Sequence, residues 1–173
     1  MGSFQNITAS DRFVLPAYAA QPSGAPKGAI VVLQEIFGVN SHIQTVTDVY
    51  AAQGYIAVAP STFHRVKADV NLGYTPEDIQ AGIALKAAAE AVLPLVMQDV
   101  QAAVDFATQQ LQTGGKVGVV GYCWGGLLTW RAAAMVKGIS AAVPYYGGGM
   151  TVGVEPQRHP KVPGWQLRSR SQK

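Results

Sequence analysis

Cysteine and charged residues are both scarce in this sequence. A single cysteine among 173 residues excludes an internal disulfide framework. Charged residues make up 13% and hydrophobic residues 49%, a balance that excludes an intrinsically disordered chain and allows one domain with a substantial core. The sequence has no Cys/His cluster with metal-ligand spacing and no glycine-rich phosphate loop, so we expect neither a metal nor a cofactor.

Basic charge is concentrated at the end of the chain. Residues 158–173 contain five basic and no acidic residues, so the first 157 residues carry 8 basic against 10 acidic groups, a net charge of −2. Because nucleic-acid binding needs a basic face on the folded body, we expect no nucleic-acid partner. Residues 1–20 have no continuous apolar run, and residues 79–96 are interrupted by charged residues and a proline, so we expect no signal peptide and no membrane span. The expected location is the cytoplasm.

Strand-like and helix-like segments alternate along the chain. Short runs typical of strands buried on both faces follow a first predicted strand at 13–19, and they fall at 29–33, 55–59, 117–120 and 141–143. Capping signals and helical spacing predict helices at 41–53, 76–93, 95–111 and 124–136, with Pro94 ending or kinking the second helix. This order predicts an α/β fold with a mostly parallel sheet and helices on both faces.

The end of the sequence does not continue this pattern. Residues 1–163 read as one α/β domain, whereas residues 164–173 fit no element and are interpreted as an irregular basic tail. The segment Lys161-Val162-Pro163 resembles the entry to a further strand, after which the pattern stops, so we expect a sheet that lacks its last strands. The strand at 141–146 would then form an unprotected edge, which favours self-association.

The sharpest local signal is Gly121-Tyr122-Cys123-Trp124-Gly125-Gly126, between a predicted strand and a predicted helix. This is the pattern of a nucleophile elbow, with cysteine at the nucleophile position. Glycine neighbours allow the sharp turn, and the start of the following helix favours a thiolate over a thiol. An inert buried cysteine is the alternative, but the strand-to-helix context favours a functional Cys123.

A second signal is Gln34-Glu35-Ile36-Phe37-Gly38-Val39-Asn40, which begins where the strand at 29–33 ends. Ligands of parallel α/β sheets bind at this end of the strands. An acid beside an all-apolar strand is costly unless it has a partner or a function, although a solvated loop carboxylate is the simpler alternative. Because Cys123 is expected at the same end of the sheet, we interpret Glu35 as functional.

The two motifs together resemble the dienelactone hydrolase family, whose members open enol-lactones in aromatic degradation. The order of strands and helices between the motifs is also similar, and the resemblance extends over about residues 10–163. It implies an α/β-hydrolase-type fold. It also implies hydrolysis of small-molecule lactones or activated esters, the carboxymethylenebutenolidase type of reaction, without a cofactor.

The resemblance further implies roles for individual residues. Cys123 would be the nucleophile, and Glu35 would hold the resting thiol and then take its proton when substrate binds. The backbone N–H groups of Ile36 and Trp124 would form the oxyanion hole. Tyr145 would line the pocket.

Two other catalytic members of the family have no match in this sequence: an Asp after a later strand and a His on a still later loop. Glu155 and His159 are the one acid and the one histidine after Cys123, but they lie four residues apart in a proline-flanked segment, which does not suit a triad. The family's substrate-binding arginines are also unmatched, and Arg65 is the one position we suggest for them. Slow or absent turnover is therefore expected.

Three functional hypotheses stay open from the sequence. The first is a dienelactone-hydrolase-type enzyme that acts through an acyl-Cys123 intermediate. The second is a catalytically inactive fragment or pseudoenzyme. The third is a redox-sensing deglycase-like or amidotransferase-type cysteine protein, because those families also place cysteine on a strand-to-helix turn.

Overall fold

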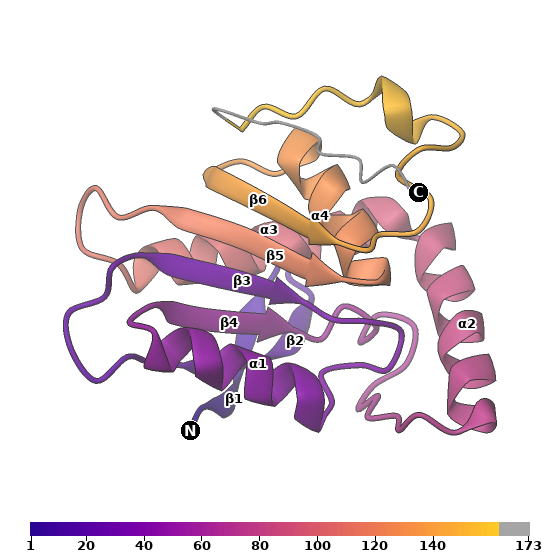
Figure 1. Ribbon diagram of the computed structural model, residues 1–173, viewed down its shortest axis with the longest axis horizontal. Helices are drawn as coiled ribbons and strands as arrows, with labels where there is room; N and C mark the ends of the chain where they lie inside the picture. Colours follow the sequence, from indigo (N-terminus) through magenta and orange to yellow (C-terminus); the bar gives the residue numbers. More distant parts are fainter. Residues whose placement is uncertain (163–173) are drawn as a thin grey trace, which may run out of the picture.

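The predicted alternation produces one six-stranded mixed sheet in the computed structural model, which describes residues 1–162 (Figure 1). The strands are β1 (Ser3–Thr8), β2 (Val14–Ala20), β3 (Ala29–Leu33), β4 (Ile56–Pro60), β5 (Val117–Tyr122) and β6 (Ile139–Tyr145). Their order across the sheet is β1-β2-β4-β3-β5-β6. The strands β4, β3, β5 and β6 run parallel, whereas β1 and β2 add an antiparallel end. The predicted α/β class with a mostly parallel sheet is confirmed.

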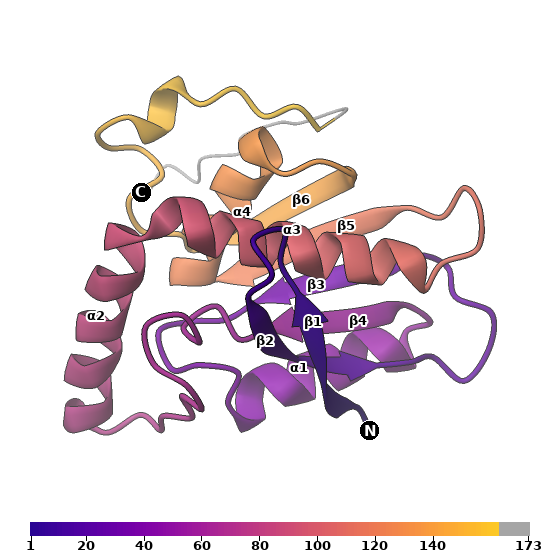
Figure 2. The same ribbon diagram turned by 180° about the vertical axis from the view of Figure 1, so that it is seen from behind.

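Helices cover both faces of this sheet, as the two views show (Figures 1 and 2). They are α1 (Ser41–Ala52), α2 (Pro76–Ala91), α3 (Leu93–Gln109) and α4 (Trp124–Met135), with a 3-10 turn at Glu155–Gln157. Side-chain alternation along β3 explains the two layers: Val31 packs in the core shared with α3 and α4, whereas Val32 packs with Ile43 of α1. Continuous apolar strands are thus explained by burial on both faces.

The break between α2 and α3 falls where the proline predicted it. The two helices are separated by Val92 and meet at 94°, and Pro94 occupies the first turn of α3. A proline is tolerated there because the first N–H groups of a helix have no intrahelical partner. The helix α2 therefore projects from the body along the right-hand side of Figure 1, whereas α3 lies against the sheet. Across residues 1–162, no single helix is long and apolar enough to cross a membrane, although this bent pair passes such a test by length and composition together.

Two expectations about strands need correction. The strand β1 was not predicted, because most of its residues are polar and almost all are exposed, and only its pairing with β2 makes it a strand. The strand at 141–143 exists, as β6, but it is not buried on both faces: Ala141, Val143 and Tyr145 are exposed. Within residues 1–162, β6 pairs with β5 alone and forms an edge of the sheet. The predicted tail at 164–173 lies outside the described residues and stays a prediction.

Candidate functional site

Cys123 lies on a sharp turn between β5 and α4, as the motif predicted. Its backbone has φ 53° and ψ −117°, a conformation that L-residues rarely adopt and that the surrounding structure must hold in place. Two neighbours have to be glycine: a Cβ on Gly121 would collide with the carbonyl of Gly125, and a Cβ on Gly125 would collide with the carbonyl of Leu33. The turn is fixed further by the Cys123 N–H, which donates to the Tyr145 carbonyl at 3.1 Å.

The two N–H groups expected in the oxyanion hole are available. Trp124 is the first residue of α4, and Ile36 follows Glu35 at the end of β3. Within residues 1–162, neither backbone N–H donates to a protein acceptor. Free N–H groups beside a helix start attract negative charge. Both N–H groups are therefore without a protein acceptor among the described residues, and their role in an oxyanion hole stays a prediction.

The Trp124 side chain is part of the core. The residue is 2% exposed, its indole ring stacks on Phe63 with ring centroids 4.7 Å apart, and its Nε1 donates to the Glu90 carboxylate at 2.7 Å. Glu90 also accepts from Arg131 at 2.7 Å. Only the backbone of Trp124 thus faces the candidate site, while its side chain ties α4 to α2.

Glu35 does not stand alone at the end of β3. The residue is half-buried, and its carboxylate accepts a 3.2 Å hydrogen bond from the hydroxyl of Tyr146. Burial raises the pKa of Tyr146 to about 12, helped by the charge of Glu35 and by Cys123. Glu35 and Cys123, the two side chains that we expect to react, therefore both contribute to the raised pKa of Tyr146. Sequence analysis missed Tyr146, although it precedes a glycine and directly follows the predicted pocket residue.

Tyr145, which we expected to line the pocket, points elsewhere. Its ring stacks on Tyr122 at 5.1 Å and 4°, and the Tyr122 hydroxyl lies 3.3 Å from that of Tyr50 on α1. Tyr145 is therefore on the α1 side of the sheet, in a row of tyrosines, and it contributes to the site through its backbone carbonyl. Gln34, the residue before Glu35, is fully buried, and its side-chain amide has no protein partner within residues 1–162.

None of the three histidines contacts Cys123 in the described structure. His42 is exposed at the start of α1, His159 is exposed near the end of the described chain, and His64 packs against Phe13 at 5.9 Å. Glu155 is buried, and its carboxylate forms ion pairs with two arginines, with Arg131 at 2.9 Å and with Arg158 at 2.6 Å. The acid and the histidine that follow Cys123 therefore do not form a pair.

Arg65, the position suggested for substrate binding, is paired with two acidic residues. Its side chain forms a fork to the fully buried Asp99, with both distances 2.8 Å, and it contacts Asp11 at 2.8 Å. Its guanidinium lies over the ring of Phe13 at 4.2 Å. All of these contacts are at the antiparallel end of the sheet or on α3, and the suggestion that Arg65 binds substrate stays a prediction.

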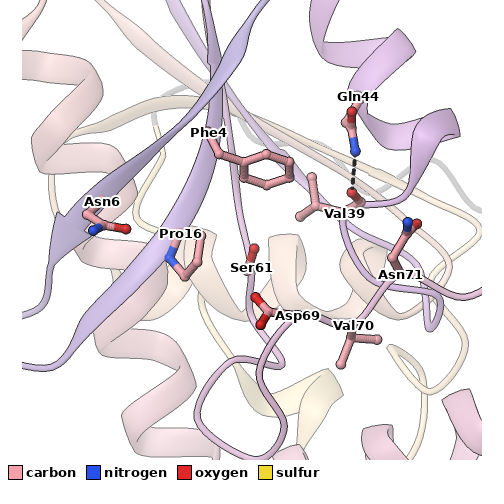
Figure 3. Close-up of a pocket in the computed structure, with 9 residues that line it drawn as sticks. All are labelled: Phe4, Asn6, Pro16, Val39, Gln44, Ser61, Asp69, Val70 and Asn71. Atoms are coloured by element: carbon pink, nitrogen blue, oxygen red, sulfur yellow. Dashed lines mark hydrogen bonds between the residues drawn. The ribbon is translucent and has the colours of Figure 1, made fainter.

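A cavity of about 450 Å³ lies apart from Cys123, between the β1-β2 hairpin and the segment before α2 (Figure 3). It is lined by Phe4, Asn6, Pro16, Val39, Gln44, Ser61, Asp69, Val70 and Asn71. The Gln44 amide is held by the Val39 carbonyl at 2.9 Å. Neither Cys123 nor Glu35 borders this cavity. Among residues 1–162, no three His, Cys, Asp or Glu side chains converge on a potential metal site.

Comparison with known proteins gives a consistent result. The chain is 38% identical over 147 residues to the carboxymethylenebutenolidase of Pseudomonas putida, covering 84% of this chain and 61% of that protein. It is 41% identical over 137 residues to a protein from Methylorubrum extorquens assigned as a carboxymethylenebutenolidase, covering 78% of this chain and 45% of that protein. The chain thus spans about half the length of the curated relatives it matches.

A solved structure from Klebsiella pneumoniae, assigned as a dienelactone hydrolase, matches with a TM-score of 0.64 and 30% sequence identity. The match covers 84% of this chain and 60% of that chain. The dienelactone hydrolase family itself matches residues 15–163, which include both motifs. The chain belongs to the dienelactone hydrolase family.

Proposed function

We propose that this protein opens small-molecule lactones or activated esters, with Cys123 as the nucleophile and Glu35 as the base that takes the thiol proton. The observation that carries this proposal is the elbow: a strained Cys123 that the chain holds with glycines and a hydrogen bond from its own N–H. Strain of this kind is found at functional sites, because the surrounding structure must stabilise it. The family assignment favours the hydrolase over the redox-sensing and amidotransferase alternatives.

Acylation follows from the residues in place. Glu35 takes the proton from the Cys123 thiol, and the thiolate sulfur then attacks the carbonyl carbon of the substrate. The oxyanion forms beside the N–H groups of Ile36 and Trp124, which stabilise it without reorganisation. The carbon–oxygen bond breaks, the leaving oxygen takes up the proton that Glu35 holds, and the acyl group stays on sulfur as a thioester.

Deacylation is the step that the described residues do not support. Water must attack the thioester, and a histidine normally deprotonates that water. No histidine in the described structure contacts Cys123, and Glu155 is held by two arginines. We therefore propose that this chain acylates readily but turns over slowly. A cytoplasmic location forms part of the proposal, because the nucleophile has to remain a reduced thiol.

The test is a burst experiment with an activated aryl ester. The expected result is a fast release of about one phenol per chain followed by a slow steady rate, with both phases absent in Cys123→Ala. Mass spectrometry of the quenched mixture should find the acyl group on the peptide that contains Cys123. A burst that survives in Cys123→Ala, or no burst from a folded wild-type chain, would reject Cys123 as nucleophile. Fast steady turnover would reject the proposed slow deacylation.

A further inference from the structure

Tyr146 is the one side chain that contacts Glu35 by a hydrogen bond in the described structure, and its hydroxyl lies 3.2 Å from Oε1. The second carboxylate oxygen, Oε2, has no side-chain or backbone donor within residues 1–162. The Cys123 thiol likewise has no hydrogen-bond partner there. One carboxylate oxygen is thus held by tyrosine, and the other is free to receive a proton.

The backbone holds Tyr146 in a conformation that would not form by itself. Its φ is 37°, in the left-handed region that is unfavourable for a tyrosine. The next residue, Gly147, is buried against Gly126 of α4, and an added Cβ would lie 2.7 Å from the Gly126 carbonyl carbon. The preceding residue, Tyr145, accepts the N–H of Cys123 at 3.1 Å. The same turn therefore fixes the backbone of the nucleophile and directs Tyr146 toward Glu35.

The titratable groups that act on the Tyr146 hydroxyl come from three parts of the chain. They are Glu35 after β3, Cys123 on the elbow and Tyr74 just before α2. The Tyr122 ring lies 6.2 Å from the Tyr146 ring, on the side of the tyrosine row. With 65% of its surface exposed, the Tyr146 side chain is packed on one side only and makes its polar contact with Glu35.

We propose that Tyr146 is a positioning residue for Glu35: by donating to one oxygen of the carboxylate, it directs the other toward the Cys123 thiol. This inference rests on the proposed function, because it assigns to Tyr146 the control of the base in that reaction. A hydroxyl that donates to the carboxylate reduces the negative charge acting on the thiol. While Glu35 stays ionised, the resting thiol therefore loses its proton to solvent at lower pH, and the same hydrogen bond makes Glu35 a weaker acceptor for that proton.

The test uses the fact that Cys123 is the only cysteine in the chain. The rate of alkylation by iodoacetamide, measured across pH, reports the ionisation of this one thiol without any need for turnover. In Tyr146→Phe the carboxylate loses its donor, so the thiol should ionise at higher pH and alkylation near neutral pH should slow by roughly three- to tenfold. In Glu35→Gln the thiol should ionise at lower pH.

The decisive comparison is the double variant. If Tyr146 acts through Glu35, Tyr146→Phe should have no further effect in the Glu35→Gln background. Tyr145→Phe is the matched control, because its hydroxyl does not contact Glu35, and it should alkylate like the wild type. An equal effect of Tyr146→Phe in both backgrounds, or no effect in either, would overturn the proposal, provided that thermal unfolding shows each variant to be folded.

The outcome separates this inference from the proposed function. If the acyl burst is missing but the thiol titration depends on Tyr146 only when Glu35 is present, the hydrolase proposal fails and the positioning role stands. If the burst is present but the double variant shows additive effects, the positioning role fails and the hydrolase proposal stands. If Glu35→Gln leaves the thiol titration unchanged, Glu35 does not act on Cys123 and both assignments fail.

Discussion

Gly125 is the residue whose replacement should disturb the elbow most directly. Its missing Cβ is what lets the start of α4 pass the carbonyls of Leu33 and Gln34 at the end of β3. We expect Gly125→Ala to destabilise the fold by about 1–3 kcal/mol, because the helix must move away from the sheet. Denaturant unfolding would measure this change. Gly148→Ala is the control: an added Cβ there meets nothing within 4 Å, and its stability should stay close to wild type.

Asp99 gives a second prediction at the scale of single residues. Burial raises the pKa of its carboxyl to about 6 from 3.8, although Arg65 opposes the shift. Because the folded state binds this proton more tightly than the unfolded state, the stabilisation is complete below about pH 4 and is lost as the pH rises through about 6. We expect the free energy of unfolding to decrease by at most about 3 kcal/mol over this range because of Asp99.

The variant Asp99→Asn should remove that pH dependence, even though it also leaves Arg65 less well paired. Asp105→Asn is the matched control, since Asp105 is exposed on the same helix, and it should keep the wild-type slope. Denaturant titrations at several pH values between about 4 and 7 give the slopes directly. A slope that survives in Asp99→Asn would assign the pH dependence to another group.

The sequence predicted where the two candidate residues that belong to local motifs lie in the fold. Cys123 and Glu35 each stand at the end of an apolar strand, and parallel strands bring these ends together. Tyr146 could not be predicted in the same way, because it meets Glu35 across 111 positions of sequence and only through the turn that follows β6. The stacking of the Tyr145 ring on Tyr122 was missed for a related reason. Tyr145 is the last residue of β6, and the direction of a side chain changes where a strand ends.

Among the elements, α2 has a role that its composition does not suggest. It is alanine-rich and mostly exposed, and yet it contacts both candidate oxyanion residues. Gly82 packs closely against the carbonyl of Ile36, and Glu90 binds the indole of Trp124 and the guanidinium of Arg131. The projecting helix α2 therefore contacts the surroundings of the candidate site at two positions, Gly82 and Glu90.

We expect Glu90→Ala to destabilise the protein by about 1–3 kcal/mol, because it leaves the buried Trp124 N–H without its partner and removes one of the two carboxylates that pair with Arg131. Denaturant unfolding gives the size of the change. Glu77→Ala, an exposed position in the first turn of the same helix, should change stability by less than about 1 kcal/mol. Equal losses in the two variants would show that the helix, and not the contact with Trp124, is what responds.

The boundaries of the elements were predictable where a local signal marks them. The Thr75 cap with Asp78 begins α2, and Pro94 coincides with the bend into α3. Hydrophobic patterning could not reveal β1, because a strand that is exposed on one side and pairs antiparallel at an edge needs few apolar residues. The burial of β6 was overestimated, because an apolar strand sequence does not tell whether a second layer covers it.

At the scale of the whole molecule, the sheet is asymmetric. Within residues 1–162, its antiparallel end is closed by the mostly polar strand β1, whereas the parallel end finishes at β6 with apolar side chains on the open face. A groove of about 130 Å³ beside α1 is lined by Ile30, Tyr50, Gly118, Val119, Val120, Ala141, Val143 and Tyr145. Unpaired apolar edges associate with other strands unless charge or a covering element prevents it. The apolar end of the sheet is therefore the surface through which we expect copies of this chain to associate.

Val143 is the position at which to test this expectation. It is 46% exposed on β6, so Val143→Lys adds charge to the edge without removing a core contact. Sedimentation velocity over a range of concentrations should show wild-type association that the lysine weakens at least several-fold. Val152→Lys, at a residue 63% exposed and outside any strand, should associate like the wild type. A monomeric wild type, or equal loss in both variants, would show that the β6 edge does not drive association.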